Sequence, residues 1–345
     1  MSQMSKMPTV KDVAEYAGVS VGTVSRVLSG EAAVKPMLRE RVNGAISALG
    51  YRPNVTARAL RTSRTDVIGL IVPDITNPFF AQLAASVERA ALESGHSLML
   101  ASSHNDRVAE QSHVAAFLDR SVRGIIVVAS SDGPALHLQA PVPVISLDRR
   151  FGTFPLVSTN HAQAAALIAD HLYGLGHRRI AYIAGPTDTE AGRIRKEGFV
   201  SRIDQFGESG EPVELEIAYG RFDYESGERI ARDLLSRPPQ DRPTAIAAAS
   251  DQQAIGALRA ARDLKIDVPR KLSVTGFDDI SLANLVVPRL TTIRQPADML
   301  ARRAVGLLLE EPSGTGDEMI DGALIVRGSS GACPQPKADN AGHRS

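Results

Sequence analysis

The feature that most constrains the fold is a regular alternation of short apolar runs and helical segments that begins at Val67. The first run, VIGLIVP, is apolar at nearly every position, as expected of a strand buried on both faces of a sheet. The alternation continues through SLMLASS, GIIVVAS and VPVISLD, pauses in a connector at residues 151–160, and resumes with RIAYIAG, LEIAY, AIAAAS and LSVTGFD. Because crossovers between parallel strands are right-handed, this pattern predicts two doubly wound α/β units, each with a parallel sheet.

The order of the runs predicts a two-lobed body at residues 66–328. We expect an N-lobe of residues 66–160 and 294–328 and a C-lobe of residues 161–293. In this interpretation TTIRQP is the strand by which the chain returns to the first unit. The strand MIDGALIVRG should end the fold, and residues 329–345 are expected to form a disordered tail. The carboxyl ends of the strands would then face a cleft between the lobes.

A second constraining stretch runs from Thr9 to Leu28, TVKDVAEYAGVSVGTVSRVL, and predicts two short helices around a tight turn. Thr9 can cap the first helix together with Asp12, and Gly18 can end it in a left-handed conformation. Ser20 can cap the second helix. A third helix between residues 36 and 50 would complete a small all-α head.

The second of these helices has a slim outer face, with the short or hydrogen-bonding residues Gly22, Thr23, Ser25 and Arg26 between its apolar positions. Such a helix can lie in the major groove of DNA with Arg26 near the base edges, although a helical hairpin within a bundle has the same periodicity. The distribution of charge favours DNA binding, although a merely solvated face can carry the same bias. Residues 1–64 hold ten Lys and Arg against four Asp and Glu, so the head carries +6 and the rest of the neutral chain −6. A basic head on an acidic body indicates a polyanionic partner for the head.

The head, residues 1–52, is followed by a basic segment at residues 53–65 that predicts a hinge helix. Asn54 can cap two helical turns, which are too short to be stable alone and would order only against a partner or DNA. The apolar edge formed by Ala57 and Leu60 could then wedge between base steps in the minor groove. The alternative is a basic linker without fixed structure.

Other classes of protein find little support in the sequence. VPDITNP stands where a GxGxxG loop would follow the first strand, and GxSxG, HExxH and CxxC motifs are missing, so we expect neither an enzyme nor a bound cofactor. The eight histidines lack metal-ligand spacing, and we expect no metal site. With a single cysteine, Cys333, no signal peptide and no apolar run of about 20 residues, we expect a cytoplasmic chain.

Polar and aromatic residues recur where predicted strands end. They are Asp74, Asn77, Phe79 and Phe80 after the first strand, Asp148 and Arg149 after the fourth, Arg193 and Arg195, Ser250, Asp251 and Gln252, and Asp278 and Asp279. Carboxylates and guanidinium groups around an aromatic ring suit a polyhydroxylated ligand, because acids accept and arginine donates to paired hydroxyls. Each residue could instead cap a helix, and for Asp74, Asp251 and Asp279 capping is the expected role.

Three motifs in this order, DVAEYAGVSVGTVSRVLSG, LGYRPNVTARALR and VIGLIVPDITNPFFAQL, resemble the LacI–GalR family of bacterial transcriptional regulators. The resemblance covers the chain to about residue 328 and implies a periplasmic-binding-protein-like body. It also implies a homodimer on near-palindromic operator DNA. The implied DNA-binding residues are Val21, Gly22 and Arg26 at base edges, Thr23 and Ser25 at phosphates, and Ala57 and Leu60 in the minor groove, with Thr9, Ser20 and Asn54 beside them.

The same resemblance implies a small-molecule effector in the cleft. Phe79, Asp148, Arg195 and Asp278 match effector-contacting positions of the family, Asp74 lies near them in our reading, and Ser250 stands where many members have Asn. A sugar or sugar derivative is the expected effector of a repressor, and a purine or nucleoside is the alternative. A solute-binding protein for transport would share the body but should have a secretion signal and no basic head.

Overall fold

The computed structural model describes residues 8–28, 34–51, 65–133, 141–310 and 316–334. Within it the chain divides into two compact units, residues 1–65 and 66–345. The expected hinge positions Asn54, Ala57 and Leu60 lie outside the described residues.

The head consists of three helices, α1 (Val10–Ala17), α2 (Val21–Leu28) and α3 (Pro36–Leu49). Thr9 caps α1 as predicted, with Asp12 N–H donating to its hydroxyl and the Asp12 carboxylate accepting from Thr9 N–H. Gly18 ends α1 with φ 62°, and Arg41 of α3 donates to the carbonyl of Ala17 at 2.6 Å. The small core includes Tyr51, which the apolar periodicity of the helices did not predict.

The first lobe is built on a six-stranded sheet in the order β11-β5-β4-β3-β1-β2, with every pairing parallel. Ile68 and Leu70 pack on one face of this sheet beneath α5 and α11, whereas Ile71 packs on the other face beneath α6. The elements are β1 (Val67–Val72), α5 (Pro78–Glu93), β2 (Ser97–Ser102), α6 (Arg107–Asp119), β3 (Gly124–Val127), β4 (Val144–Leu147), β5 (Leu156–Thr159), α11 (Ala297–Leu309) and β11 (Glu318–Ile320).

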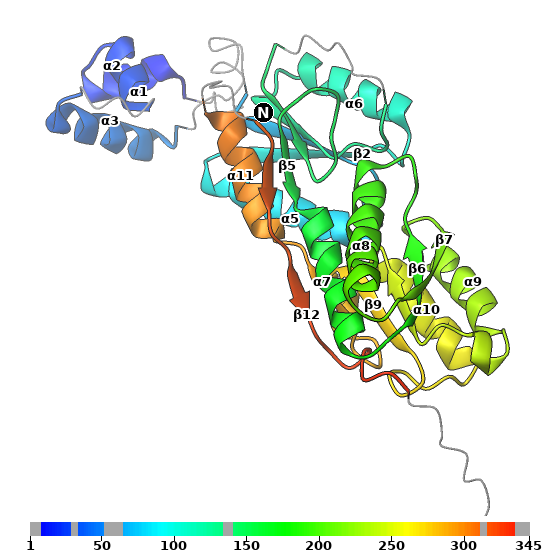
Figure 1. The fold of residues 1–345 in the computed structure, drawn as a ribbon. Coiled ribbons are helices and arrows are strands. Elements are labelled where there is room, and N and C mark those ends of the chain that lie inside the picture. The colour runs from blue at the N-terminus through cyan, green and yellow to red at the C-terminus, as the bar shows by residue number, and fades with distance from the viewer. Residues whose placement is uncertain (1–7, 29–33, 52–64, 134–140, 311–315, 335–345) are drawn as a thin grey trace, which may run out of the picture. The chain divides into compact units, whose positions relative to one another are not determined.

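The second lobe has a six-stranded sheet in the order β12-β10-β9-β8-β6-β7, in which only the β10–β12 pair is antiparallel. Tyr182 of β6 faces α7 and α8, which pack side by side (Figure 1), and Ile183 faces α9 and α10. The elements are α7 (His161–Gly174), β6 (Arg179–Ala184), α8 (Glu190–Ser209), β7 (Glu214–Tyr219), α9 (Tyr224–Leu235), η1 (Pro239–Asp241), β8 (Ala245–Ala248), α10 (Asp251–Asp263), β9 (Ser273–Asp278), η2 (Ser281–Asn284), β10 (Thr291–Arg294) and β12 (Ala323–Ile325).

Two predictions about strands are wrong. The expected connector at residues 151–160 contains β5, which pairs with β4 and β11. The expected last strand is two strands, β11 in the first sheet and β12 in the second, so residues 323–328 belong to the second lobe and not to the first. Gly322 lies at this crossing, where a Cβ would come unusually close to Ile293, at 3.1 Å, and to the carbonyl of Arg294, at 3.2 Å. The chain therefore crosses between the lobes near residues 160, 295 and 321.

The prediction of disorder from residue 329 is also wrong for residues 329–334. Ser329 is fully buried, donates to the carbonyl of Val274 at 2.6 Å and accepts from Thr291 N–H at 2.8 Å. The buried ring of His177 lies within hydrogen-bond distance of the carbonyl of Gly331, at 3.1 Å. The composition of the segment is polar, but its polar groups form hydrogen bonds with the second lobe.

None of the helices in the described part of the chain has the length and apolar character that a membrane span requires.

Candidate functional site

The outer face of α2 has the slim shape that the sequence predicted. Val21, Gly22 and Arg26 are exposed, whereas Val24 is fully buried in the head core. Among the described residues, a Cβ on Gly22 would approach only the Ser20 hydroxyl, at 3.7 Å, so the packing of these residues does not require the small size of residue 22. Ser20 caps α2 by accepting from Thr23 N–H at 3.1 Å. The helix thus presents backbone, small groups and one guanidinium to solvent.

A buried polar cluster lies where the two lobes meet, around the side chain of Arg195, which α8 supplies. Its Nη1 donates to Asp278 Oδ1 at 3.1 Å and to the carbonyl of Ala249 at 2.8 Å. Its guanidinium lies 3.9 Å from the centre of the Phe277 ring. Gln295 donates to the same Asp278 oxygen at 2.7 Å. Strands β8 and β9 and helix α8 therefore meet at the site through one arginine.

His161 links the two lobes of the site and was not predicted as a functional residue. Its Nδ1 accepts from Arg195 Nε at 3.3 Å, so the ring is neutral with its proton on Nε2. Nε2 lies 3.5 Å from Asp148 Oδ1 and 3.3 Å from Ser158 Oγ. Burial and the Arg195 charge lower the pKa of His161, in agreement with the neutral form. The signal in the sequence was a polar residue at the start of the first helix after the crossing at residue 160.

Asp148 and Arg149 form the first-lobe half of the site, and both are buried. Burial opposes ionisation of Asp148, but His161, Arg195 and Arg149 outweigh it and hold the pKa of Asp148 below its ordinary value. Arg149 Nη1 lies 3.5 Å from the carbonyl of Ser130. Among the described residues, Asp148 Oδ1 and Arg149 Nε are buried without a hydrogen-bond partner. Buried polar groups without a partner are rare and costly in folded proteins, so these two require an explanation.

Two aromatic rings flank the arginines. The guanidinium of Arg149 lies 5.0 Å from the ring centre of Phe80 and 5.5 Å from that of Phe222. Arg195 lies 5.6 Å from the same Phe222 ring. Phe222, in the loop after β7, was missed because LEIAY ends before it and nothing local marks the residue. Phe79 instead lines a neighbouring hollow of about 470 Å³ together with Asp278 and Gln295.

The backbone is unusual at both cleft carboxylates. Asp148 has φ 62° and Asp278 has φ 120°, a region that side chains rarely adopt. Residues held in this way cluster at ligand sites, where the surrounding structure compensates the strain. Burial raises the pKa of Asp278 to about 6, although Arg195 and Gln295 favour its ionised form.

The three residues expected to cap helices do not do so. Asn77 caps α5, while Asp74 accepts from Thr76 N–H at 2.9 Å in a turn that precedes the helix. Ser250 caps α10 and lies next to Ala249, whose carbonyl Arg195 contacts.

Asp251 follows that cap and is fully buried, accepting from Thr292 Oγ1 and from Ile280 N–H. Asp279 pairs with Arg294 at 2.7 Å and with Arg327 at 2.6 Å. The structure thus brings Asp148, Arg195 and Asp278 together, whereas the carboxylate of Asp74 is bonded within its own turn.

Comparisons with known proteins agree with both parts of the chain. Residues 9–54 match the family described as bacterial regulatory proteins, lacI family, and residues 169–330 match the periplasmic binding protein-like domain. The ribose operon repressor of Escherichia coli (strain K12) is 33% identical over 309 residues, covering 88% of this chain and 92% of that protein. The HTH-type transcriptional regulator MalR of Streptomyces coelicolor is 36% identical over 340 residues, covering 94% and 96%.

Solved structures show the same similarity. The lac repressor dimer bound to operator and the anti-inducer ONPF has a TM-score of 0.78 at 28% identity, covering 95% of this chain and 100% of that one. A complex of the transcriptional regulator CelR with cellobiose has a TM-score of 0.65 at 31% identity, covering 94% and 100%. The predicted fold class, a helix-turn-helix head on a two-lobed α/β body, is confirmed. The chain belongs to the lacI family of bacterial regulatory proteins.

Proposed function

We propose that the protein is a homodimeric transcriptional repressor whose head binds operator DNA and whose cleft binds a sugar or sugar derivative that changes operator affinity. The proposal rests on the presence of a DNA-binding surface and a ligand site in the same chain. An exposed helix with a slim face lies in a head of charge +6, and a buried cluster with unsatisfied polar atoms lies between two lobes.

The head supports DNA binding through shape and charge. Val21, Gly22 and Arg26 would face base edges, because short side chains let the backbone of α2 approach the floor of the major groove. Thr23 and Ser25 lie partly buried at the side of the same helix, where phosphate contacts would fix its register. The hinge residues Asn54, Ala57 and Leu60 remain proposed minor-groove contacts.

The cleft supports an uncharged polyhydroxylated ligand. One hydroxyl can donate to Asp148 Oδ1 while another accepts from Arg149 Nε, which would satisfy both unpaired groups. Asp278 and Arg195 offer the same combination from the second lobe. The apolar face of a sugar ring could pack on Phe80 and Phe222, which flank Arg149. Phe79 and Ser250 would line the walls of the ligand site, and Asp74 would contact the ligand at its edge.

The proposed dimer rests on the relatives, because the lac repressor structure is that of a dimer on operator DNA. Binding in the cleft would change the lobe arrangement and hence the spacing of the two heads. A coupling of about 1–3 kcal/mol is typical of such regulators. A transport solute-binding protein would share the body, but it gives no reason for the helix-turn-helix head.

A ligand screen on the full-length protein tests the effector site. Thermal shift against a panel of sugars, purines and nucleosides should identify a stabilising sugar, and Asp148→Asn should abolish that shift. Asp263→Asn is the matched control, because Asp263 pairs with Arg232 on the surface of the second lobe. A shift only with purines or nucleosides would favour the alternative effector. A sugar shift that survives Asp148→Asn would remove Asp148 from the site.

A further inference from the structure

The short segment at residues 130–132 touches both halves of the cleft. It follows β3 in the first lobe and leads from Ser130, through Ser131, to Asp132. Ser130 contacts the arginine of its own lobe, since its carbonyl lies 3.5 Å from Arg149 Nη1. Asp132 contacts the second lobe, where α8 supplies the other arginine.

The contact of Asp132 with the second lobe is built from three interactions. Its Oδ1 accepts from the N–H of Glu190, the first residue of α8, at 2.9 Å. Its Oδ2 pairs with Arg193, one turn further along the helix. Its own N–H donates to the carbonyl of Asp188 at 2.8 Å. A carboxylate at a helix N-terminus is stabilised by the unpaired N–H groups and by the helix dipole.

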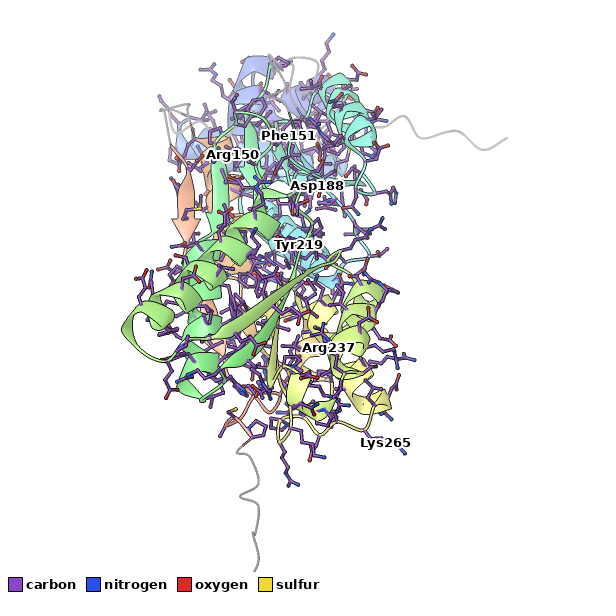
Figure 2. The ribbon with its side chains drawn as sticks, turned by 45° about the vertical axis from the view of Figure 1, so that its right-hand side comes forward. Arg150, Phe151, Asp188, Tyr219, Arg237 and Lys265 are labelled. Carbon is purple, nitrogen blue, oxygen red and sulfur yellow. The ribbon has the colours of Figure 1, made fainter. Side chains whose placement is uncertain are left out.

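Further contacts brace this junction. The buried Glu110 of α6 accepts from the N–H of Ser130 at 2.6 Å and from its hydroxyl at 2.8 Å, which fixes the start of the segment. Arg150, held by Asp317 of its own lobe, lies 3.7 Å from Glu190 of the second lobe. Figure 2 labels Arg150 of the first lobe and Asp188, which precedes Glu190 in the second.

The contact between Asp132 and the second lobe lies to one side of the three chain crossings, so it would resist rotation of one lobe against the other. The chain crosses between lobes at β5, β10 and the β11–β12 link, which lie toward one side of each sheet. Asp132 follows β3, two strands from β5, and Asp188 follows β6, three strands from β10. With about 4.8 Å between strands, the contact lies roughly 10–14 Å to the side of the crossings. A rotation of the lobes about the crossings would pull it apart.

We propose that residues 130–132 form a strap that positions both cleft arginines and holds the two lobes closed. Ser130 fixes the position of the Arg149 guanidinium. Asp132 fixes the first turn of α8 and thereby the position of Arg195. Closure by the strap would raise the affinity of the cleft for its ligand, because binding-competent molecules would be more populated. That consequence rests on the proposed function, whereas lobe closure itself can be measured without any ligand.

The distance between the lobes of the full-length protein tests the strap directly. Spin labels would be placed at Val108→Cys on α6, which is 71% exposed, and at the exposed Ser236→Cys after α9, in a Cys333→Ser background. Labelled protein would be diluted into excess unlabelled protein, so that pulsed electron–electron double resonance reports the distance between the two labels of one subunit. Figure 1 shows that α6 and α9 lie on the side of the body away from β12.

Graded variants should open the cleft in graded amounts. Asp132→Asn removes the ion pair but can still accept from Glu190 N–H, so the ratio of closed to open molecules should fall about two- to fivefold. Asp132→Ala removes both interactions and should lower the ratio about tenfold. Arg193→Gln should resemble Asp132→Asn, and the two together should not add, because they break the same pair.

The matched control is Asp170→Asn, which breaks the 2.7 Å pair with Arg202 of the same helix α8 but within the second lobe. It should leave the distances unchanged. Circular dichroism checks folding, and if Asp132→Ala fails to fold, the near-isosteric Asp132→Asn and Arg193→Gln decide the matter. Distances in those two variants that equal the parent's, or a control that opens the cleft equally, would overturn the proposal.

Discussion

At the scale of residues, the cleft holds charged groups in states that burial disfavours. Asp278 is buried among Arg195, Gln295, Asp148 and Asp251, and its pKa is raised to about 6, with burial as the largest cause. The ordinary value for an aspartate in an unfolded chain is about 3.9. The folded protein therefore binds a proton here more tightly than the unfolded chain between about pH 4 and pH 6.

This raised pKa predicts a pH dependence of stability with a definite sign. Because the folded state binds more protons in that window, the free energy of unfolding should fall as pH rises from 4 to 6, by an amount on the order of 3 kcal/mol from this group. Asp278→Asn should remove that part of the slope. Urea denaturation of parent and variant at pH 4.5 and 7 measures the difference, and equal slopes would contradict the assignment.

Arg26 predicts a difference between specific and non-specific DNA binding. Arg26→Ala removes the guanidinium proposed to contact a base edge, so operator affinity should fall about ten- to a hundredfold, with a much smaller loss on random DNA. Fluorescence anisotropy with both duplexes measures the two losses. An equal loss on both would make Arg26 a phosphate contact.

Sequence reasoning found the cleft residues that end predicted strands and missed those that reach the cleft from elsewhere. Asp148, Arg195 and Asp278 follow or lie near strand ends and converge as expected. His161 and Phe222 were missed because their roles depend on how the lobes meet, and no local pattern encodes that arrangement. Asp74 and Asp251 do not cap because neighbouring Asn77 and Ser250 accept from the first N–H groups. Asp279 does not cap because its carboxylate pairs with Arg294 and Arg327.

At the scale of elements, the alternation of apolar runs predicted both sheets but not the path of the last strands. The run MIDGALIVRG is continuous in pattern, yet the chain passes from one sheet to the other at Gly322. Likewise β5 is only four residues long and was hidden in a connector. Short strands carry too little periodicity to be distinguished from loops.

The segment at residues 329–334 predicts a specific loss of stability. Ser329→Ala removes a buried hydroxyl and leaves the N–H of Thr291 and the carbonyl of Val274 without their partner. The free energy of unfolding should fall by about 1–3 kcal/mol. Ser112→Ala on the exposed part of α6 is the matched control and should change it by less than about 0.5 kcal/mol. Chemical denaturation measures both, and equal values would mean that the segment contributes no stability.

At the scale of the whole molecule, charge is divided between the two functions. The first 64 residues carry +6 and the rest −6. This division predicts a steep dependence of DNA affinity on salt, because each phosphate contact by Lys or Arg releases counterions. If six phosphates are neutralised, the slope of log affinity against log salt should be about −5. Titrations between 50 and 200 mM salt measure it, and a flat response would exclude the basic head as the contact.

Ligand binding in the cleft should control DNA binding by the head of the same chain. Footprinting of the full-length protein on the DNA upstream of its own gene, with and without the stabilising sugar, measures this coupling. We predict a protected near-palindromic site whose protection changes with the sugar in the parent but not in Asp148→Asn. Protection that does not change with the sugar, or no protected site at all, would contradict this coupling.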